Sequence, residues 1–246
     1  MDRKSSPTFA QIGMPCPLFE APVADATGFE PRGNCAVCGS RDIAVFNTGG
    51  EFEVVACYAC LRTGRVPCMK DTEFGFVDAE HAARGLTHGT PSPPPPALGY
   101  ELVPHSGDSE DEDAPSGDAP CPTYQGEGFV MWDAGDAGER WYSVRIAREH
   151  LEELLRTPNY STWQGEQWQF CCHRPAVFVG AWELDDWTRA AAERGVEVPA
   201  LLQEVLDLRP REAADLAEWL GGDSTVSTYV FRCSTCGKLR AHQDST

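Results

Sequence analysis

Three pairs of cysteines in this sequence are separated by two residues, a spacing that can present both sulfurs to one metal ion. Between the pairs Cys35–Cys38 and Cys57–Cys60 lie 18 residues, a number typical of a four-thiolate zinc site. A thioredoxin-like redox pair is the alternative for any single pair, but redox proteins rarely need two pairs at this spacing. Four thiolates leave zinc no position for water. The pattern therefore predicts a structural Zn²⁺ bound by these four cysteines.

The third pair, Cys233 and Cys236, is half of a second site whose other ligands must come from elsewhere in the chain. The segment FCCHRPAVF offers the other clustered soft ligands. If this segment is extended, its side chains alternate, so that Cys172 faces one way and Cys171 and His173 face the other. Either Cys172 alone or Cys171 together with His173 would then point at the metal.

We therefore predict a second Zn²⁺ bound by Cys172, Cys233 and Cys236. Its fourth ligand stays open among Cys171, His173 and His242. The simpler alternative is that Cys171 and Cys172 are buried apolar residues, since free cysteine is among the most buried residue types. No catalytic residue is predicted.

Composition limits the class of protein. The chain has 246 residues, of which 41% are hydrophobic, and carries a formal net charge of -18. This charge opposes binding to a phosphate backbone. The N-terminus has no apolar core of a signal peptide, and no apolar run is long enough to cross a bilayer. We expect a cytoplasmic protein, where thiols stay reduced and eleven cysteines favour metal ligation over disulfides.

The order of sequence patterns predicts an α+β fold with three regions. Residues 1–89 contain the zinc-ribbon-like β region, in which the strand-like runs DIAVFN and FEVVAC separate the two cysteine pairs. Residues 90–122 are a Pro-rich acidic linker or insertion, and within them 104–120 should be disordered and dispensable for folding. Residues 123–246 form a mixed α/β body with a helical segment at 183–222 and the C-terminal zinc knuckle.

Several segments together resemble the CbrC family of small bacterial proteins. They are PTFAQIGMPCPLFEA, then CAVCG, CYAC and GFVDAEHA, then LLRTPNYSTWQGEQWQFCC, and finally YVFRCSTCGKLRAH. The resemblance implies an association with tolerance to a DNase-type colicin, and it implies no catalytic residue. Residues 90–145 look like an insertion relative to the family pattern. Ala176 or a neighbour stands where the family usually has a further cysteine.

Three functions are compatible with these patterns. The first is a tolerance or immunity factor that binds a basic protein such as a nuclease toxin through the acidic helical region 183–223. The second is a zinc hydrolase that uses Cys172, Cys233 and Cys236 with a water, and Glu166 or His173 as general base. The third is nucleic-acid binding by the ribbon. Its basic residues, which acidic neighbours offset, are Arg32, Arg41, Arg62, Arg65 and Lys70.

Overall fold

The structure is a computed structural model, and it describes residues 5–48, 54–85, 101–103, 130–131, 140–141, 143–222 and 226–245. The chain forms two units. The sheet–helix unit comprises Met1–Thr27, Tyr160–Gly165 and Ala176–Thr246, and the ribbon unit comprises Gly28–Asn159 and Glu166–Pro175. Both contain helices and antiparallel strands, so the predicted α+β class is confirmed.

A three-stranded antiparallel sheet is the centre of the sheet–helix unit. Its strands are β12 (Val177–Trp182), β13 (Val226–Arg232) and β14 (Leu239–Ser245), in that order. Strands β12 and β13 pair antiparallel, and Phe178 stands opposite Phe231. Both rings are fully buried, and they meet with centroids 5.2 Å apart.

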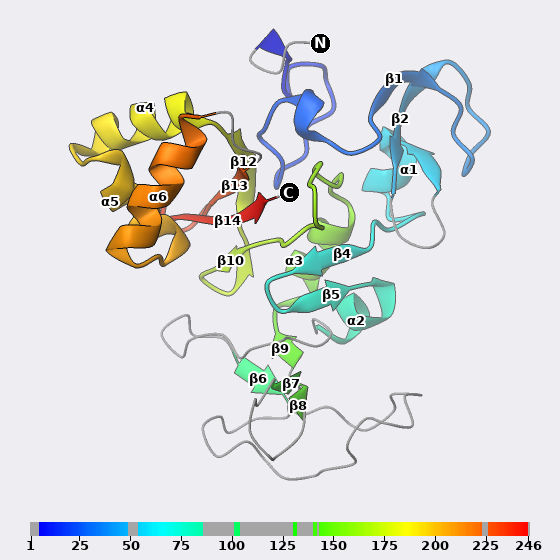
Figure 1. Cartoon of the computed structure of the whole chain (residues 1–246). Coiled ribbons are helices and arrows are strands. Elements are labelled where there is room, and N and C mark those ends of the chain that lie inside the picture. Colours follow the sequence, from blue (N-terminus) through cyan, green and yellow to red (C-terminus); the bar gives the residue numbers. More distant parts are fainter. Residues whose placement is uncertain are drawn as a thin grey trace. The chain divides into compact units, whose positions relative to one another are not determined.

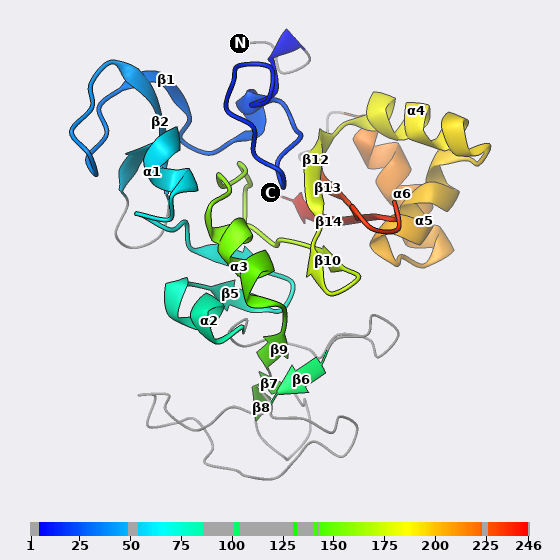
Figure 2. The same ribbon diagram turned by 180° about the vertical axis from the view of Figure 1, so that it is seen from behind.

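Three helices follow β12, and both ribbon views place them on one side of this sheet (Figures 1 and 2). They are α4 (Leu184–Arg194), α5 (Val198–Leu206) and α6 (Pro210–Leu220). These helices form the predicted helical segment at 183–222. Gly195 ends α4 in the left-handed conformation at φ 67°, and proline stands in the first turn of α5 and of α6.

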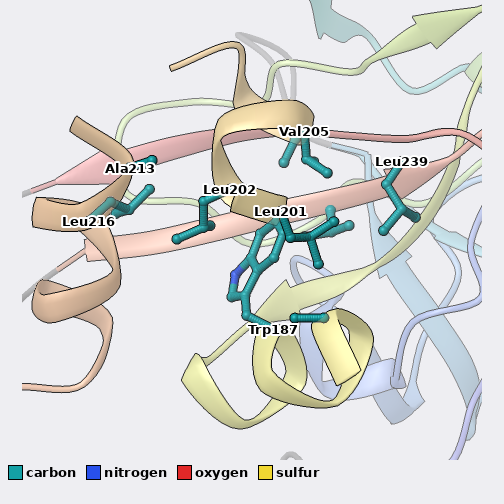
Figure 3. Close-up of a cluster of buried hydrophobic side chains, with 10 residues drawn as sticks. Trp187, Leu201, Leu202, Val205, Ala213, Leu216 and Leu239 are labelled. Carbon is teal, nitrogen blue, oxygen red and sulfur yellow. The ribbon is translucent and has the colours of Figure 1, made fainter. Parts of the chain in front are cut away.

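The helices pack on the sheet through a cluster of buried aliphatic side chains around Trp187 (Figure 3). Leu201, Leu202 and Leu216 come from the helices, and Leu239 comes from β14. The Trp187 indole donates a hydrogen bond of 2.8 Å to the Thr228 hydroxyl on β13. This contact satisfies a buried donor, so the core carries a tryptophan without an unpaired polar group.

The N-terminal segment adds a second cluster to this unit. Phe9 and Phe19 are buried, with ring centroids 5.2 Å apart. The Phe19 ring also meets Phe178 at 5.1 Å, and Tyr160 stacks on Phe178 at 4.5 Å. The short 3₁₀ turn Val23–Asp25 follows, and the Asp25 carboxylate accepts a hydrogen bond from the Ala181 backbone. The N-terminal segment is thus part of the folded unit.

The ribbon unit begins with the sheet β1-β2-β3, formed by Glu30–Gly33, Ile43–Asn47 and Val55–Cys57, and continues into α1 (Tyr58–Arg62). Strands β2 and β3 confirm the predicted runs flanking the ribbon turn. Further on come the hairpin β4 (Lys70–Thr72) and β5 (Gly75–Val77), and the helices α2 (Ala79–Arg84) and α3 (Arg148–Leu155). The last pair is β10 (Phe170–Cys171) with β11 (Arg174–Pro175).

Two small strand pairs belong to the region predicted as an insertion. β7 (Val130–Met131) pairs with β8 (Arg140–Trp141). β6 (Glu101–Val103) pairs with β9 (Ser143–Arg145), although Glu101–Val103 was predicted to be linker. The apolar pair Leu102 and Val103 gives this short run a strand preference that the surrounding prolines lack. The predicted boundaries at 89/90 and 122/123, and the tract 104–120, lie outside the described residues.

In the described part of the chain, no helix has both the length and the apolar character needed to cross a membrane.

Candidate metal centres

The structure brings the first four predicted cysteines together. Sulfurs of Cys35, Cys38, Cys57 and Cys60 all lie within 4.8 Å of one another. Cys35 and Cys38 stand on the loop between β1 and β2, Cys57 ends β3, and Cys60 lies on α1. The ribbon strands thus place two chain segments around one point. Three of these residues are buried and Cys38 is exposed.

A glycine turn shapes the two knuckles of the CxxCG type. Gly39 and Gly237 follow the second cysteine at φ 74° and 73°, a backbone conformation that favours glycine. In both turns the glycine N–H donates to the carbonyl of the first cysteine at 2.9 Å. The N–H of the first cysteine also donates to a backbone carbonyl in each knuckle: Cys35 to Ser40 at 2.8 Å, and Cys233 to Lys238 at 2.9 Å. The two knuckles therefore share one backbone geometry.

Backbone N–H groups also point at the sulfurs. The Cys57 N–H donates to the Cys35 sulfur at 3.2 Å, and the N–H groups of Thr235 and Cys236 lie 3.4 Å and 3.5 Å from the Cys233 sulfur. Such donors stabilise negative charge on sulfur, which a thiolate ligand carries and a thiol does not. This arrangement suits metal ligation better than a role as packed apolar thiols.

The second group of cysteines has four sulfurs. Those of Cys171, Cys172, Cys233 and Cys236 lie within 4.8 Å of one another. The hairpin β10–β11 leads directly into β12, whose first residue Val177 pairs with Arg232, the neighbour of Cys233. Among the candidates for the fourth ligand of the second site, Cys171 thus lies with the other three cysteines.

The prediction did not place Cys171 and Cys172 at one metal ion, because it was made for an extended segment in which neighbouring side chains face opposite ways. Cys172 and His173 instead form the two-residue turn of the β10–β11 hairpin, both with positive φ, at 53° and 60°. A turn with two positive φ angles reverses the chain and cancels the alternation of side chains, which allows adjacent cysteines to face one point. Asn-Gly is the usual signal for such a turn, and Cys-His carries no such signal.

The two histidines considered as fourth ligand are not in this cysteine group. His242 lies inside the sheet–helix unit, where its Nε2 is 2.7 Å from the Tyr160 hydroxyl and its ring stacks on Tyr229 at 4.9 Å. His173 occupies the turn position next to Cys172. Of the candidate ligands, Cys171 is the one that the structure places with the other three sulfurs.

The donor set fits zinc. Four sulfurs around Zn²⁺ at about 2.3 Å stand about 3.8 Å apart. The Cys38–Cys57 and Cys171–Cys172 sulfur pairs are each separated by 3.8 Å. Four thiolates are soft ligands, which select zinc over magnesium or calcium. Two cysteine tetrads that could bind metal ions are therefore present among the described residues.

The thiols of the first tetrad have very different acidities. The Ser40 hydroxyl, 3.2 Å from the Cys38 sulfur, lowers the pKa of that thiol to about 6. Burial and the neighbouring thiol of Cys57 raise the pKa of Cys60 to about 12, while Arg65 acts in the opposite direction. Four crowded thiols cannot all ionise without a compensating cation. A divalent ion would provide that compensation for all four.

Other residues named as functional candidates have structural roles. Lys70 is fully buried, and its ammonium donates to the Pro158 carbonyl at 2.9 Å and to the Asn159 side chain at 2.5 Å. Glu166, the candidate general base, lies 3.7 Å from the same ammonium. The Lys70 ammonium also stands 4.8 Å from the centre of the Trp168 ring. These contacts hold the segment after α3 against β4.

The sequence matches the model of one uncharacterised protein family. No solved structure matches this chain significantly. The model of the uncharacterised protein family UPF0167 matches residues 18–245, and this is the family to which CbrC belongs. The matched range includes both cysteine tetrads and every helix and sheet described above. The chain therefore belongs to the uncharacterised protein family UPF0167.

Proposed function

We propose that the protein is a non-catalytic, zinc-stabilised binding protein, and that both cysteine tetrads are closed structural Zn²⁺ sites. The observation that carries this proposal is the fourth sulfur of the second tetrad, that of Cys171. With four thiolate ligands a zinc ion has no position left for water or substrate. In the cytoplasm, where thiols stay reduced, such sites persist. They then contribute to folding free energy, by about 10 kcal/mol or more per site.

Elemental analysis of purified full-length protein tests the metal part of the proposal. Two zinc ions per chain are expected. Replacement of Cys60 or of Cys236 by serine should remove one ion each, and replacement of both should remove two. A matched control is Cys68→Ala, because Cys68 is buried and stands in neither tetrad. If the parent protein binds no zinc after expression in zinc-supplemented medium, the proposal is wrong.

The hydrolase alternative needs an open coordination position and a free base. Four sulfurs at the second tetrad leave no such position. The carboxylate of Glu166 faces the buried Lys70 ammonium instead of a metal-bound water. The alternative would regain support if a zinc-dependent hydrolytic activity disappeared in Cys233→Ala.

The nucleic-acid alternative loses part of its basic cluster. Lys70 is fully buried, so it cannot contact a phosphate. Arg62 binds the Glu153 carboxylate at 2.7 Å and 3.0 Å, and Arg32 lies 3.9 Å from Asp42. With a net charge of -18 the chain would also repel the nucleic-acid backbone.

The proposed partner is a basic protein, and a nuclease toxin is the example that the family resemblance suggests. The acidic helices α4, α5 and α6 support this choice. Residues 183–222 hold ten carboxylates and four arginines. Each of these arginines lies within 4 Å of a carboxylate in the same unit. The excess negative charge would steer a basic protein toward these helices.

Binding to a nuclease toxin can be measured directly. Tagged protein is used to capture partners from bacterial lysate, with and without added toxin, and the association rate of any captured basic protein is then measured. Reversal of adjacent carboxylates on α4 to lysine should slow association more than it speeds dissociation, and added salt should shrink the difference. Capture of no basic protein under either condition would contradict the proposal.

A further inference from the structure

One cysteine of the first tetrad faces water. Cys35, Cys57 and Cys60 are buried, whereas Cys38 is exposed. Cys38 lies on the loop between β1 and β2, and residues 39–42, which follow it on this loop, are exposed as well. A dissolved reagent therefore meets the Cys38 sulfur before it meets the three buried sulfurs of the same tetrad.

A buried sulfur lies close to the exposed one. The sulfurs of Cys38 and Cys57 are 3.8 Å apart, although the two residues are 19 positions apart in the sequence. A disulfide bond is about 2.05 Å long, so the two sulfurs would have to approach each other by about 2 Å. Cys38 stands on an exposed loop, where the backbone moves more easily than inside a strand. Cys57 is thus placed to form a disulfide with Cys38.

The close sulfur pair of the second tetrad differs in one respect. The sulfurs of Cys171 and Cys172 are also 3.8 Å apart, but these two residues are neighbours in the sequence. Consecutive Cα atoms stand about 3.8 Å apart, less than the usual span of about 4.4 to 6.8 Å across a disulfide. A disulfide between neighbouring residues is therefore strained. The Cys38–Cys57 pair has no such limit.

Metal ligation prepares Cys38 for oxidation. A cysteine that binds zinc does so as a thiolate, and the thiolate is the form of cysteine that peroxides oxidise. Cysteines that sense oxidants combine thiolate character, access to solvent and a second cysteine close by. As a zinc ligand, Cys38 would combine all three, because it is exposed and lies 3.8 Å from the Cys57 sulfur.

We infer that Cys38 is a peroxide-sensitive site that controls the zinc ion of the first tetrad. The inference rests on the proposed function and adds a regulation of the same site. The Cys38 thiolate attacks one oxygen of a peroxide, the O–O bond breaks, and a sulfenic acid and hydroxide form. The Cys57 thiolate then attacks the Cys38 sulfur, which forms the S–S bond and displaces a second hydroxide.

The two steps account for every electron. Two thiolates lose one electron each, and these two electrons reduce one hydrogen peroxide to two hydroxide ions. Cys35 and Cys60 then remain as the only thiolates of the tetrad, too few for a closed structural zinc site, so that Zn²⁺ is released. The ribbon unit loses the folding free energy that the ion contributes. A dithiol reductant restores both thiolates, and with them the site.

The test uses the full-length, zinc-loaded chain and hydrogen peroxide as the probe. A colour-forming chelator follows the release of zinc, and a sample without peroxide measures what the chelator removes by itself. Mass spectrometry of peptides under non-reducing conditions identifies the disulfide. One zinc ion per chain should be released first, together with a disulfide between Cys38 and Cys57. Dithiothreitol and added Zn²⁺ should restore the second ion.

Histidine substitutions separate the oxidisable sulfur from metal binding. Cys38→His keeps a zinc ligand, since three cysteines and one histidine form common structural sites, but it has no sulfur to oxidise. This variant should bind two zinc ions and lose the release of zinc from the first tetrad. The matched control is Cys236→His, the same change at the exposed cysteine of the second tetrad, which should release zinc from the first tetrad as fast as the parent protein. If Cys38→His does not hold two ions, the disulfide found in the parent protein decides.

The outcomes distinguish this inference from the proposed function. The two knuckles share one backbone geometry, so a disulfide within a knuckle would form in both tetrads alike. A first product of Cys35–Cys38 or Cys233–Cys236 would therefore overturn the inference, as would a protein that keeps both zinc ions in peroxide. The proposed function would stand in either case, because it concerns the untreated protein. A parent protein that binds no zinc would defeat both.

Discussion

The buried histidine of the sheet–helix unit should make that unit sensitive to mild acid. His242 is 8% exposed, and it is enclosed by the Tyr160 hydroxyl at 2.7 Å and the stacked Tyr229 ring. The Asp244 carboxylate lies 3.7 Å from the His242 Nδ1. Burial lowers the pKa of His242 from 6.5 to about 4, although Asp244 acts in the opposite direction.

The sign of the effect follows from proton binding. Above pH 6.5 the histidine is neutral in both the folded and the unfolded chain, so its contribution to stability is fully present. As the pH falls toward 4, the unfolded chain gains a proton that the folded chain does not accept, and the folded state loses stability. Each pH unit in this window costs about 1.4 kcal/mol, so a change from about pH 7.5 to about pH 5 should cost about 2 kcal/mol.

Urea unfolding followed by tryptophan fluorescence measures this loss at several pH values. Cysteine ligands also gain protons in acid, so the parent protein is compared with His242→Gln, which keeps both tetrads and can still hydrogen-bond to Tyr160. The substitution lowers stability at neutral pH, but its pH dependence should be flatter by about 2 kcal/mol over the range. An equal pH dependence in both proteins would refute the argument that His242 is buried neutral.

Three further predictions concern a cysteine of the first tetrad, the turn residue His173 and the buried Lys70. Cys60→Ser should lose one zinc ion per chain, and with it the contribution of about 10 kcal/mol that this site makes to folding, whereas Cys68→Ala should keep all its zinc, as elemental analysis and thermal unfolding will show. His173→Gly should keep both zinc ions and change the unfolding free energy by less than about 1 kcal/mol, since glycine adopts its positive φ without strain; loss of an ion would make His173 a ligand. Lys70→Met should cost about 3 to 5 kcal/mol in urea unfolding, because Glu166 would stay buried without its cation, and a smaller loss would show that water reaches Glu166.

The ribbon and the helices could be predicted because their signals are local. The spacing of Cys35, Cys38, Cys57 and Cys60 reflects two knuckles joined by a hairpin, which needs no knowledge of the rest of the chain. Gly195 marks a helix end by its chemistry alone. Both kinds of signal depend on neighbours within one element, so the sequence contains all the information that they need.

The second tetrad was harder because its geometry depends on one turn. Alternation along a strand would have separated Cys171 from Cys172, and only the positive φ angles of Cys172 and His173 bring both sulfurs to one point. Non-glycine residues in this conformation cost about 1 kcal/mol or more each. The sequence Cys171–Cys172–His173 has no residue that favours such a turn, as glycine or asparagine would. The surroundings therefore impose it, and a metal ion that binds both cysteines would offset its cost.

The roles of Lys70 and Trp163 show a different limit. Lys70 was read as part of a basic surface because lysine is rarely buried, yet carbonyl, amide, carboxylate and indole groups surround it. Trp163 stands close in the sequence to Trp168 and Phe170, which are fully buried, yet it is 65% exposed. In both cases the partners come from distant parts of the sequence. The burial of a side chain depends on how the whole unit packs. The polarity of Lys70 and the hydrophobicity of Trp163 therefore did not predict how exposed each one is.

The strained turn at Cys172 and His173 also bears on whether the second tetrad binds metal. A cluster of packed, protonated thiols would gain little from two residues with positive φ, because an ordinary turn would bury the same side chains at lower cost. A metal site gains directly, since four sulfurs must meet around one ion at fixed distances. The knuckle at Cys233 and Cys236 already has the backbone geometry of the first tetrad, down to the glycine and its hydrogen bond. The strain and the repeated knuckle are independent observations, and both favour a metal ion at the second tetrad over four buried thiols.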